Sequence, residues 1–216
     1  SRAFITKQGT SGKEQAPGTA DNAVYAPNGT PEQGTSKYGT SLFMYSISAP
    51  TLLLSYHELK FLEAEALCRL ERDAKSALKD AVVAGLLNAE NSFTISRKEL
   101  GKTLINAASS ITEAEAESYF DNTIEAKYTA EPLKTTMTQK YFALWGASGE
   151  ATESYNDVRR MKGLGENFIE LKNPNSFPLR CPYGNSDTTT NAEVKAAYGN
   201  GQYVYSENVW WAGGSR

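Results

Sequence analysis

Residues 50–70 read PTLLLSYHELKFLEAEALCRL and form the longest run of periodic apolar residues in the chain. At 100° per residue, one face of the expected helix carries Tyr56, Leu59, Leu62, Ala66 and Leu70. The opposite face carries His57, Phe61, Ala64 and Cys68, and only Glu58, Glu65 and Arg69 form a polar stripe. A helix that is apolar on two sides is normally covered on both, so the pattern predicts the middle layer of a helical stack.

The residues after this helix carry the signals of further helices. Asp73 is a good N-cap for a second helix to about Leu87, and one face of it holds small residues: Ala74, Ala77, Ala81 and Gly85. Small residues let two helix axes approach closely, which predicts an antiparallel pair of the tetratricopeptide kind. Further helices are expected over residues 97–107, 112–128 and 150–161, with another that begins at Pro132 and ends at Gly146.

The predicted fold class is mainly α, with tetratricopeptide-like helix pairs and long irregular loops. Residues 1–49 are rich in Gly, Pro, Thr and Ser, have no helical period and are interpreted as an irregular loop segment that faces a ligand or covers a domain. Residues 50–161 form the expected helical core. Residues 162–216 form a segment rich in Pro and Gly that is expected to pack on the helices.

The composition is that of a folded protein and excludes some functions. Of 216 residues, 40% are hydrophobic and 22% are charged, and 22 basic against 25 acidic residues give a net charge of −3. Such a balance does not attract phosphate backbones, so we expect no nucleic-acid partner. There is no run of 18 apolar residues that would span a membrane. The single histidine and two distant cysteines offer no metal-ligand spacing, so neither a metal nor a cofactor is predicted.

Several polar residues are assigned structural functions. His57 lies on an apolar helix face, where a hydrogen-bonded core imidazole is more common than a catalytic one. Glu63 is placed near buried positions, so we expect it to pair with Arg159 or Arg160. Arg180, between Pro178 and Pro182, is expected to lock its loop to the helices, with a ligand contact as the alternative.

Four segments in order resemble the SusD/RagB family of surface nutrient-binding lipoproteins from Bacteroidetes, in its SusD-like second group. LLLSYHELKFLEAEAL is similar to the family's LLTYAEVKFLxAEA helix, and TQKYFALWG followed by ESYNDVRR is similar to its QKxxALxxxGxEAxxDxRR segment. FPLRCPYGNSD resembles RxPYPxxE, although Gly184 replaces the second Pro and Asp187 replaces Glu, and NVWWAGG resembles the Trp-rich end. Family members are much longer, so the chain resembles the C-terminal half of one.

The resemblance implies a non-catalytic, mostly helical binding protein on the outer face of the cell outer membrane. It would be lipid-anchored through an N-terminal Cys outside this chain, and the N-terminal half of the same protein would complete the scaffold. It would capture an oligosaccharide, other glycan or peptide and deliver it to a TonB-dependent SusC-like transporter.

Aromatic faces stack on sugar rings, and polar side chains fix the hydroxyl groups. The candidate ligand-binding residues are Tyr25, Asn28, Tyr38, Phe43 and Tyr45. Trp210 and Trp211 compete with them, although adjacent Trp residues at a chain end more often seal a core. The alternative function is a helical-repeat scaffold for protein–protein interaction or a peptide-binding lid. A glycosidase would need two carboxyl groups held across a sugar, which sequence spacing cannot indicate here.

Overall fold

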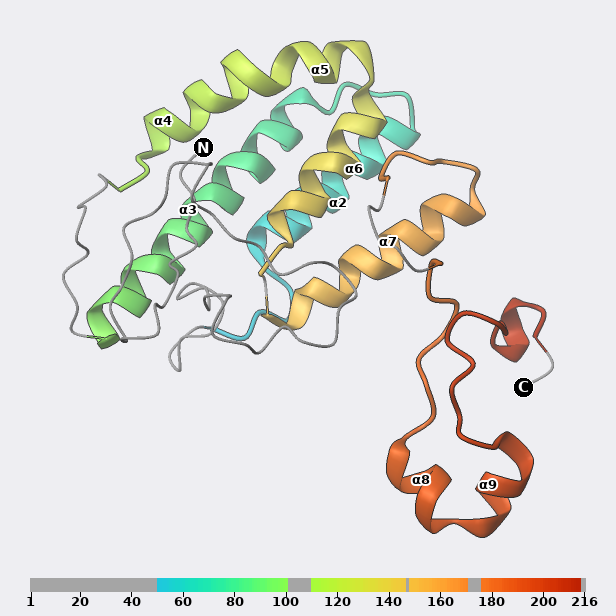
Figure 1. The fold of residues 1–216 in the computed structure, drawn as a ribbon. Helices are drawn as coiled ribbons and strands as arrows, with labels where there is room; N and C mark the ends of the chain where they lie inside the picture. The colour runs from blue at the N-terminus through green and yellow to red at the C-terminus, as the bar shows by residue number, and fades with distance from the viewer. Residues whose placement is uncertain (1–49, 101–109, 147, 171–175, 215–216) are drawn as a thin grey trace, which may run out of the picture. The chain divides into compact units, whose positions relative to one another are not determined.

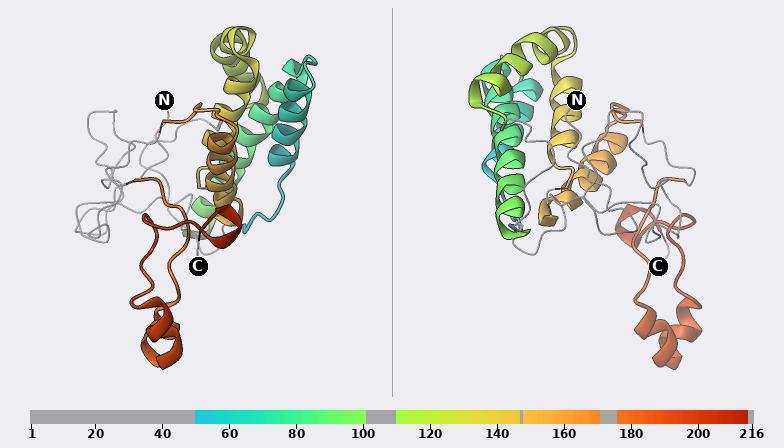
Figure 2. Two further views of the ribbon diagram at one scale, coloured as in Figure 1. Left: turned by 90° about the vertical axis from the view of Figure 1, so that its right-hand side faces the viewer. Right: turned by 60° about the vertical axis from the view of Figure 1, so that its left-hand side comes forward.

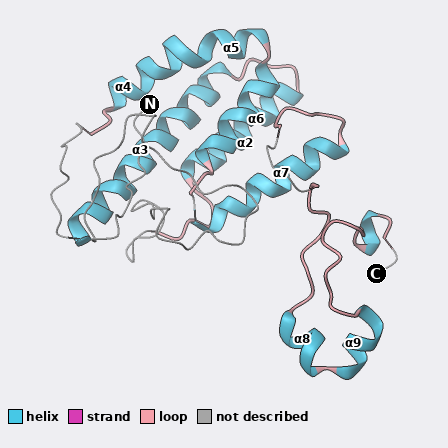
Figure 3. Ribbon diagram, in the orientation of Figure 1, coloured by secondary structure: helices cyan, strands magenta, loops and turns pink. Residues whose placement is uncertain are grey.

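A computed structural model describes residues 50–100, 110–146, 148–170 and 176–214. These residues divide into two compact units, one that ends at Glu170 and one that starts at Leu171, and each is described by itself. Within the described ranges the regular elements are all helical, as Figure 3 shows. The prediction of a mainly α fold is therefore confirmed.

The first unit is built on an antiparallel helix pair, α2 (Tyr56–Arg69) and α3 (Lys75–Leu100) (Figure 1). The Ser55 hydroxyl caps α2 by accepting the Glu58 amide at 3.1 Å. Asp73 accepts the Lys75 amide at 3.0 Å where α3 begins, as predicted. The predicted end of this helix at Leu87 is wrong. No Gly or Pro lies between Gly85 and Leu100, so the helix continues through residues 88–96, which were assigned to no element, and into the helix expected over residues 97–107.

A second helical layer begins at Thr112. Its side chain and that of Glu115 form the predicted capping box at the start of α4 (Glu113–Tyr119). One wide turn, the π-helical segment η2 (Phe120–Ile124), then joins α4 to α5 (Glu125–Ala130). The sequence pattern predicted a continuous helix here and did not indicate the wide turn.

Two further helices complete the first unit. Pro132 occupies the first turn of α6 (Pro132–Ala143), where its missing amide hydrogen costs nothing. The short 3₁₀ turn η3 (Ser148–Glu150) leads into α7 (Ala151–Gly163). None of the described helices is both long and apolar enough to cross a lipid bilayer.

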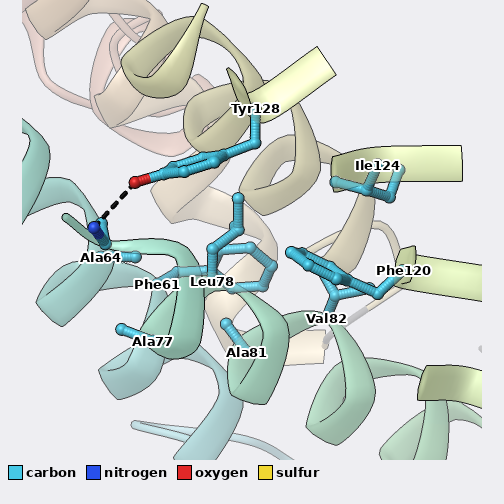
Figure 4. Packing of buried hydrophobic residues seen from close by; sticks show 10 residues of the cluster. Phe61, Ala64, Ala77, Leu78, Ala81, Val82, Phe120, Ile124 and Tyr128 are labelled. Carbon is cyan, nitrogen blue, oxygen red and sulfur yellow. Dashed lines mark hydrogen bonds between the residues drawn. The ribbon is translucent and has the colours of Figure 1, made fainter. Parts of the chain in front are cut away.

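The core of this unit lies between the helix pair and the η2–α5 region (Figure 4). It contains Ala77 and Ala81 of the predicted row of small residues and Ala74 just before α3, whereas Gly85 is only partly buried and lies outside this cluster. The left view of Figure 2 shows α2 and α3 side by side. The Tyr128 hydroxyl accepts the Ala74 amide at 2.7 Å, drawn as the dashed line in Figure 4, and donates to Asp73 at 3.0 Å. The fully buried side chains of this core are Phe61, Ala64, Ala74, Leu78, Ala81 and Phe120.

The second unit is small and contains α8 (Asn185–Thr190), α9 (Ala192–Tyr198) and the 3₁₀ turn η4 (Trp210–Ala212). Leu179 donates its amide to the Val204 carbonyl at 2.8 Å, and Tyr183 donates to Gly201 at 3.2 Å, so two segments are tied together. Gly201 has a φ of +70°, and a Cβ there would lie 2.8 Å from that of Tyr183, so a side chain does not fit. The loop predicted after Phe177 becomes helical at Asn185.

Candidate functional site

The five residues predicted to bind a ligand lie outside the described part of the chain. They are Tyr25, Asn28, Tyr38, Phe43 and Tyr45. Their function therefore stays a prediction. Within the first unit, the described residues instead bring together a buried network of charged side chains from α2, α6, η3 and α7.

Glu65 on α2 is the centre of one half of this network. Its buried carboxylate accepts hydrogen bonds from Arg160 on α7 at 2.8 Å and from Arg69 at 2.7 Å. Arg69 also forms a two-pronged bond to Glu166, with both distances 2.9 Å. Burial alone would raise the pKa of Glu65, but the hydrogen bonds from Arg160 and Arg69 lower it below the usual value.

The predicted partner of α7 was Glu63, and the structure corrects this assignment. Glu63 is exposed and bonds to Lys60 at 2.9 Å on its own helix, whereas Arg160 bonds to Glu65. Arg159 lies over the Tyr155 ring, 5.4 Å from its centre. The error has a physical cause. Nothing in the polar pattern of the stripe that contains Glu65 indicated its burial, which is possible because α7 supplies a cation.

Asp157 on α7 connects this half to the second. It accepts from Arg160 at 2.8 Å and forms an ion pair with Lys140 of α6, also at 2.8 Å. Only 2% of the Lys140 side chain is exposed, so its ammonium group depends on this partner for compensation. Two cations and two carboxylates thus join α2, α6 and α7.

The other half of the network surrounds Glu150, which is fully buried at the start of α7. The Ser55 amide donates to its carboxylate, and His57 Nε2 lies 3.9 Å from the same group and 3.2 Å from the Ser55 hydroxyl. Burial, the charge of Glu150 and a hydrogen bond with Glu150 raise the pKa of Glu58 to about 7. Burial lowers the pKa of His57, so its imidazole is neutral at pH 7. The prediction of a hydrogen-bonded core histidine is confirmed.

The bonds of this network hold the helices against one another. Its carboxylates bond to neighbouring cations or amides. Most of its members come from the two motifs at residues 52–67 and 138–160, and Arg69 and Glu166 lie just outside them. Among the described residues, no group of three His, Cys, Asp or Glu side chains is arranged to hold a metal ion. The sequence contained the signal for this network in the spacing of those motifs, but it did not indicate which residues pair.

The second unit holds an aromatic cluster of its own. The rings of Tyr183 and Tyr198 stack with centres 4.5 Å apart, and the Arg180 guanidinium lies 4.7 Å from the centre of Tyr183. Trp211 is exposed, and 74% of the neighbouring Trp210 is exposed. The interpretation that these two Trp residues seal a core is therefore wrong within this unit.

Solved structures show what this chain is similar to. The chain is 68% identical to a SusD/RagB family protein from Bacteroides thetaiotaomicron VPI-5482 and superposes on its crystal structure with a TM-score of 0.79. The match covers 92% of this chain and 43% of that one. The SusD/RagB resemblance is confirmed. This SusD/RagB-like chain thus spans less than half the length of the protein it matches.

A second solved structure is more distant. It is a candidate outer membrane protein for nutrient binding from Bacteroides vulgatus ATCC 8482, with 23% identity and a TM-score of 0.49. The match covers 75% of this chain and 34% of that one. No known family model matches the sequence, and no curated protein matches it.

Proposed function

We propose that this chain is the C-terminal half of a surface protein that captures a nutrient and delivers it to an outer-membrane transporter without chemical conversion. The nutrient would be an oligosaccharide, another glycan or a peptide. The transporter would be TonB-dependent and SusC-like, and the protein would sit on the outer face of the outer membrane through a lipid on an N-terminal Cys. The identity of 68% to a SusD/RagB family protein carries this proposal.

The organisation of the first unit supports a binding function. The charged residues of the two long motifs are used to fix helices against each other, as the bonds of Glu65, Lys140 and Glu150 show. A rigid helical scaffold of this kind can present loops to a solute. We assign ligand binding to Tyr25, Asn28, Tyr38, Phe43 and Tyr45, because flat aromatic rings and amide groups are the usual contacts for sugars and peptides.

A binding assay on the longer natural protein tests this function. Glycans and peptides would be screened on an array, and the affinity of each hit would be measured by calorimetry. Tyr38→Ala and Tyr45→Ala should each weaken binding about 2- to 12-fold, because loss of one aromatic stacking contact costs roughly 0.5–1.5 kcal/mol. Tyr119→Ala is the matched control, since Tyr119 is an exposed tyrosine on α4, and it should leave the affinity unchanged.

Two results would contradict the proposal. Turnover of a bound glycan or peptide would show an enzyme. Failure to bind any glycan or peptide, combined with stable association with another protein, would favour the alternative of a helical-repeat scaffold. Co-purification with the TonB-dependent transporter from outer membranes tests delivery separately from ligand capture.

A further inference from the structure

The chain segment that leads into α2, residues 51–55, lies against the η3 turn. The Ser55 amide donates a hydrogen bond to the Glu150 carboxylate. Gly149 lies so close to the segment that a Cβ at this position would overlap the Leu52 carbonyl oxygen, so no side chain fits there. The start of α2 is therefore fastened to η3 by one close backbone contact and by one carboxylate.

The carboxylate that accepts the Ser55 amide is only half satisfied by it. Only 1% of Glu150 is exposed, and its second oxygen, Oε2, receives no hydrogen bond from an N–H or alcohol group of the described residues. His57 Nε2 lies 3.9 Å from Oε2, which is too far for a hydrogen bond. A buried carboxylate oxygen without a donor is costly, so a proton from another acid is favoured at this place.

Glu58 is the acid that can supply this proton. Its side chain is buried on α2 and forms a hydrogen bond with Glu150. Ionised carboxylates only accept hydrogen bonds, so a bond between two of them requires that one carries a proton. Burial and the charge of Glu150 raise the pKa of Glu58 to about 7, so the pair holds one proton at pH 5 and has largely lost it at pH 8.

Charged and titratable groups from α2, α6 and α7 also face this pair. Lys140 of α6 lowers the pKa of Glu58, but its ammonium group is already paired with Asp157 at 2.8 Å. Glu153 of α7 raises the same pKa. The His57 imidazole is neutral at pH 7, since burial lowers its pKa. None of these groups gains positive charge when the proton leaves, so the two carboxylates of the pair then repel each other in a buried place.

We propose that a proton shared by Glu58 and Glu150 latches residues 51–55 to the η3 turn, and that this latch loosens as the pH rises from 5 to 8. When both carboxylates are ionised, Glu150 moves away from Glu58 and its bond to the Ser55 amide is lost. The segment connects residues 1–49 to α2 in the chain, so the attachment of this connection becomes sensitive to pH. The residues of the latch all lie in this chain, and the proposal does not rest on the proposed function.

Hydrogen exchange of the Ser55 amide tests the latch in the longer natural protein. The exchange rate would be measured by mass spectrometry on overlapping peptides and divided into the rate of an unstructured peptide at the same pH, which gives a protection factor. This factor should fall about 10-fold between pH 5 and 8, because the pair loses its proton over this range. The Ala64 amide, in the buried middle of α2, reports unfolding of the whole helix and should exchange more slowly than Ser55 at both pH values.

Two variants assign the effect to the pair. Glu58→Gln places an uncharged amide beside Glu150, so the protection of Ser55 should change by less than about 2-fold between pH 5 and 8. Glu63→Gln removes an exposed carboxylate from the same helix and should retain the 10-fold fall.

Three results would overturn the proposal. Constant protection of Ser55 in the natural protein would show that the pair does not control the segment. An unchanged pH dependence in Glu58→Gln would assign the effect to another group. Equal exchange of Ser55 and Ala64 at both pH values would show that the segment opens only when α2 unfolds, so that the pair has a structural function alone. The comparison of these two amides in the natural protein needs no variant.

Discussion

The two sides of α2 reverse the usual relation between polarity and burial. One side carries Glu58 and Glu65 and is buried against α6 and α7, whereas the other carries Leu59 and Leu62 and faces solvent. The buried side is stable because Arg160, Arg69 and neighbouring groups compensate the charges. The comparison shows that a helix face is buried when its partners satisfy it. The polarity of one helix alone therefore does not predict which of its faces is buried.

The largest expected difference between the two sides comes from neighbouring apolar residues. Phe61→Ala should lower the free energy of unfolding by about 3–5 kcal/mol, because it removes a fully buried ring and leaves a cavity. Leu62→Ala should lower it by less than about 1 kcal/mol in this chain, since 41% of Leu62 is already exposed and its removal leaves no closed cavity. Urea unfolding followed by circular dichroism measures both. Equal losses would mean that Leu62 is as deeply buried in solution as Phe61.

The next largest effect contrasts two glutamates of the same helix. Glu65→Gln should destabilise the fold by about 2–3 kcal/mol at pH 7, because Arg160 and Arg69 lose a buried charged acceptor. Glu63→Gln should change stability by less than about 0.5 kcal/mol, since its bond to Lys60 is exposed. The pKa of Glu65 is lowered in the fold, so its contribution is present above pH 4.5 and is lost as the pH falls below it. A larger effect at Glu63 would refute the assigned pairing.

The pH dependence of stability tests the buried side of α2 at a second glutamate, Glu58. Its folded pKa of about 7 lies above the ordinary value of 4.5, so the folded state retains a proton that the unfolded state has lost. The contribution of this group to the free energy of unfolding is therefore fully present below pH 4.5 and declines as the pH rises to 7. Glu58→Gln places an uncharged amide beside Glu150 at every pH. The free energy of unfolding of this variant, relative to that of the natural protein, should rise by on the order of 1–2 kcal/mol between pH 5 and 8.

Thermal unfolding at several pH values measures this change. His57 acts in the opposite direction in part of the same range, because its lowered pKa favours the neutral form in the fold. His57 is present in both proteins, so the difference between them reports on Glu58. Glu117→Gln, at an exposed position on α4, is the control and should leave the profile unchanged. A parallel profile for Glu58→Gln would show that Glu58 is ionised in the fold.

The smallest effect concerns the contact between α3 and the buried side of α2. Gly85→Ala should stabilise the protein by about 0.5–1 kcal/mol, because alanine has the higher helix propensity. The added Cβ would lie 3.5 Å from that of Ala143 and 3.9 Å from His57 Cδ2, which are ordinary contact distances. Thermal unfolding measures the gain. A loss of stability would show that the helices are packed too closely for a methyl group.

The sequence was sufficient to predict most helix positions, because local signals decide them. Ser, Thr and Pro residues at helix starts and the row of small residues on α3 depend only on neighbours in the chain. The continuation of α3 to Leu100 could also have been predicted, since polar residues without Gly or Pro do not end a helix.

The pairings of the charged network were beyond the sequence pattern. Glu63 and Glu65 differ by two positions on α2, and only the position of α7 decides which of them meets Arg160. The exposure of Leu59 and Leu62 was likewise not indicated by the apolar pattern, which predicted cover on both sides of this helix. The predicted ligand residues Tyr25, Asn28, Tyr38, Phe43 and Tyr45 lie outside the described residues, so their grouping remains a prediction.

The wide turn η2 has a consequence for how related chains are aligned. Its i→i+5 hydrogen bonding accommodates one residue more than an α-helical turn does, yet both Phe120 and Ile124 remain in the core. A homologue that is one residue shorter between Tyr119 and Glu125 could form an uninterrupted α-helix and still direct equivalent side chains inward. A single-residue gap at this place in an alignment would then mark a change of helical winding with the core preserved.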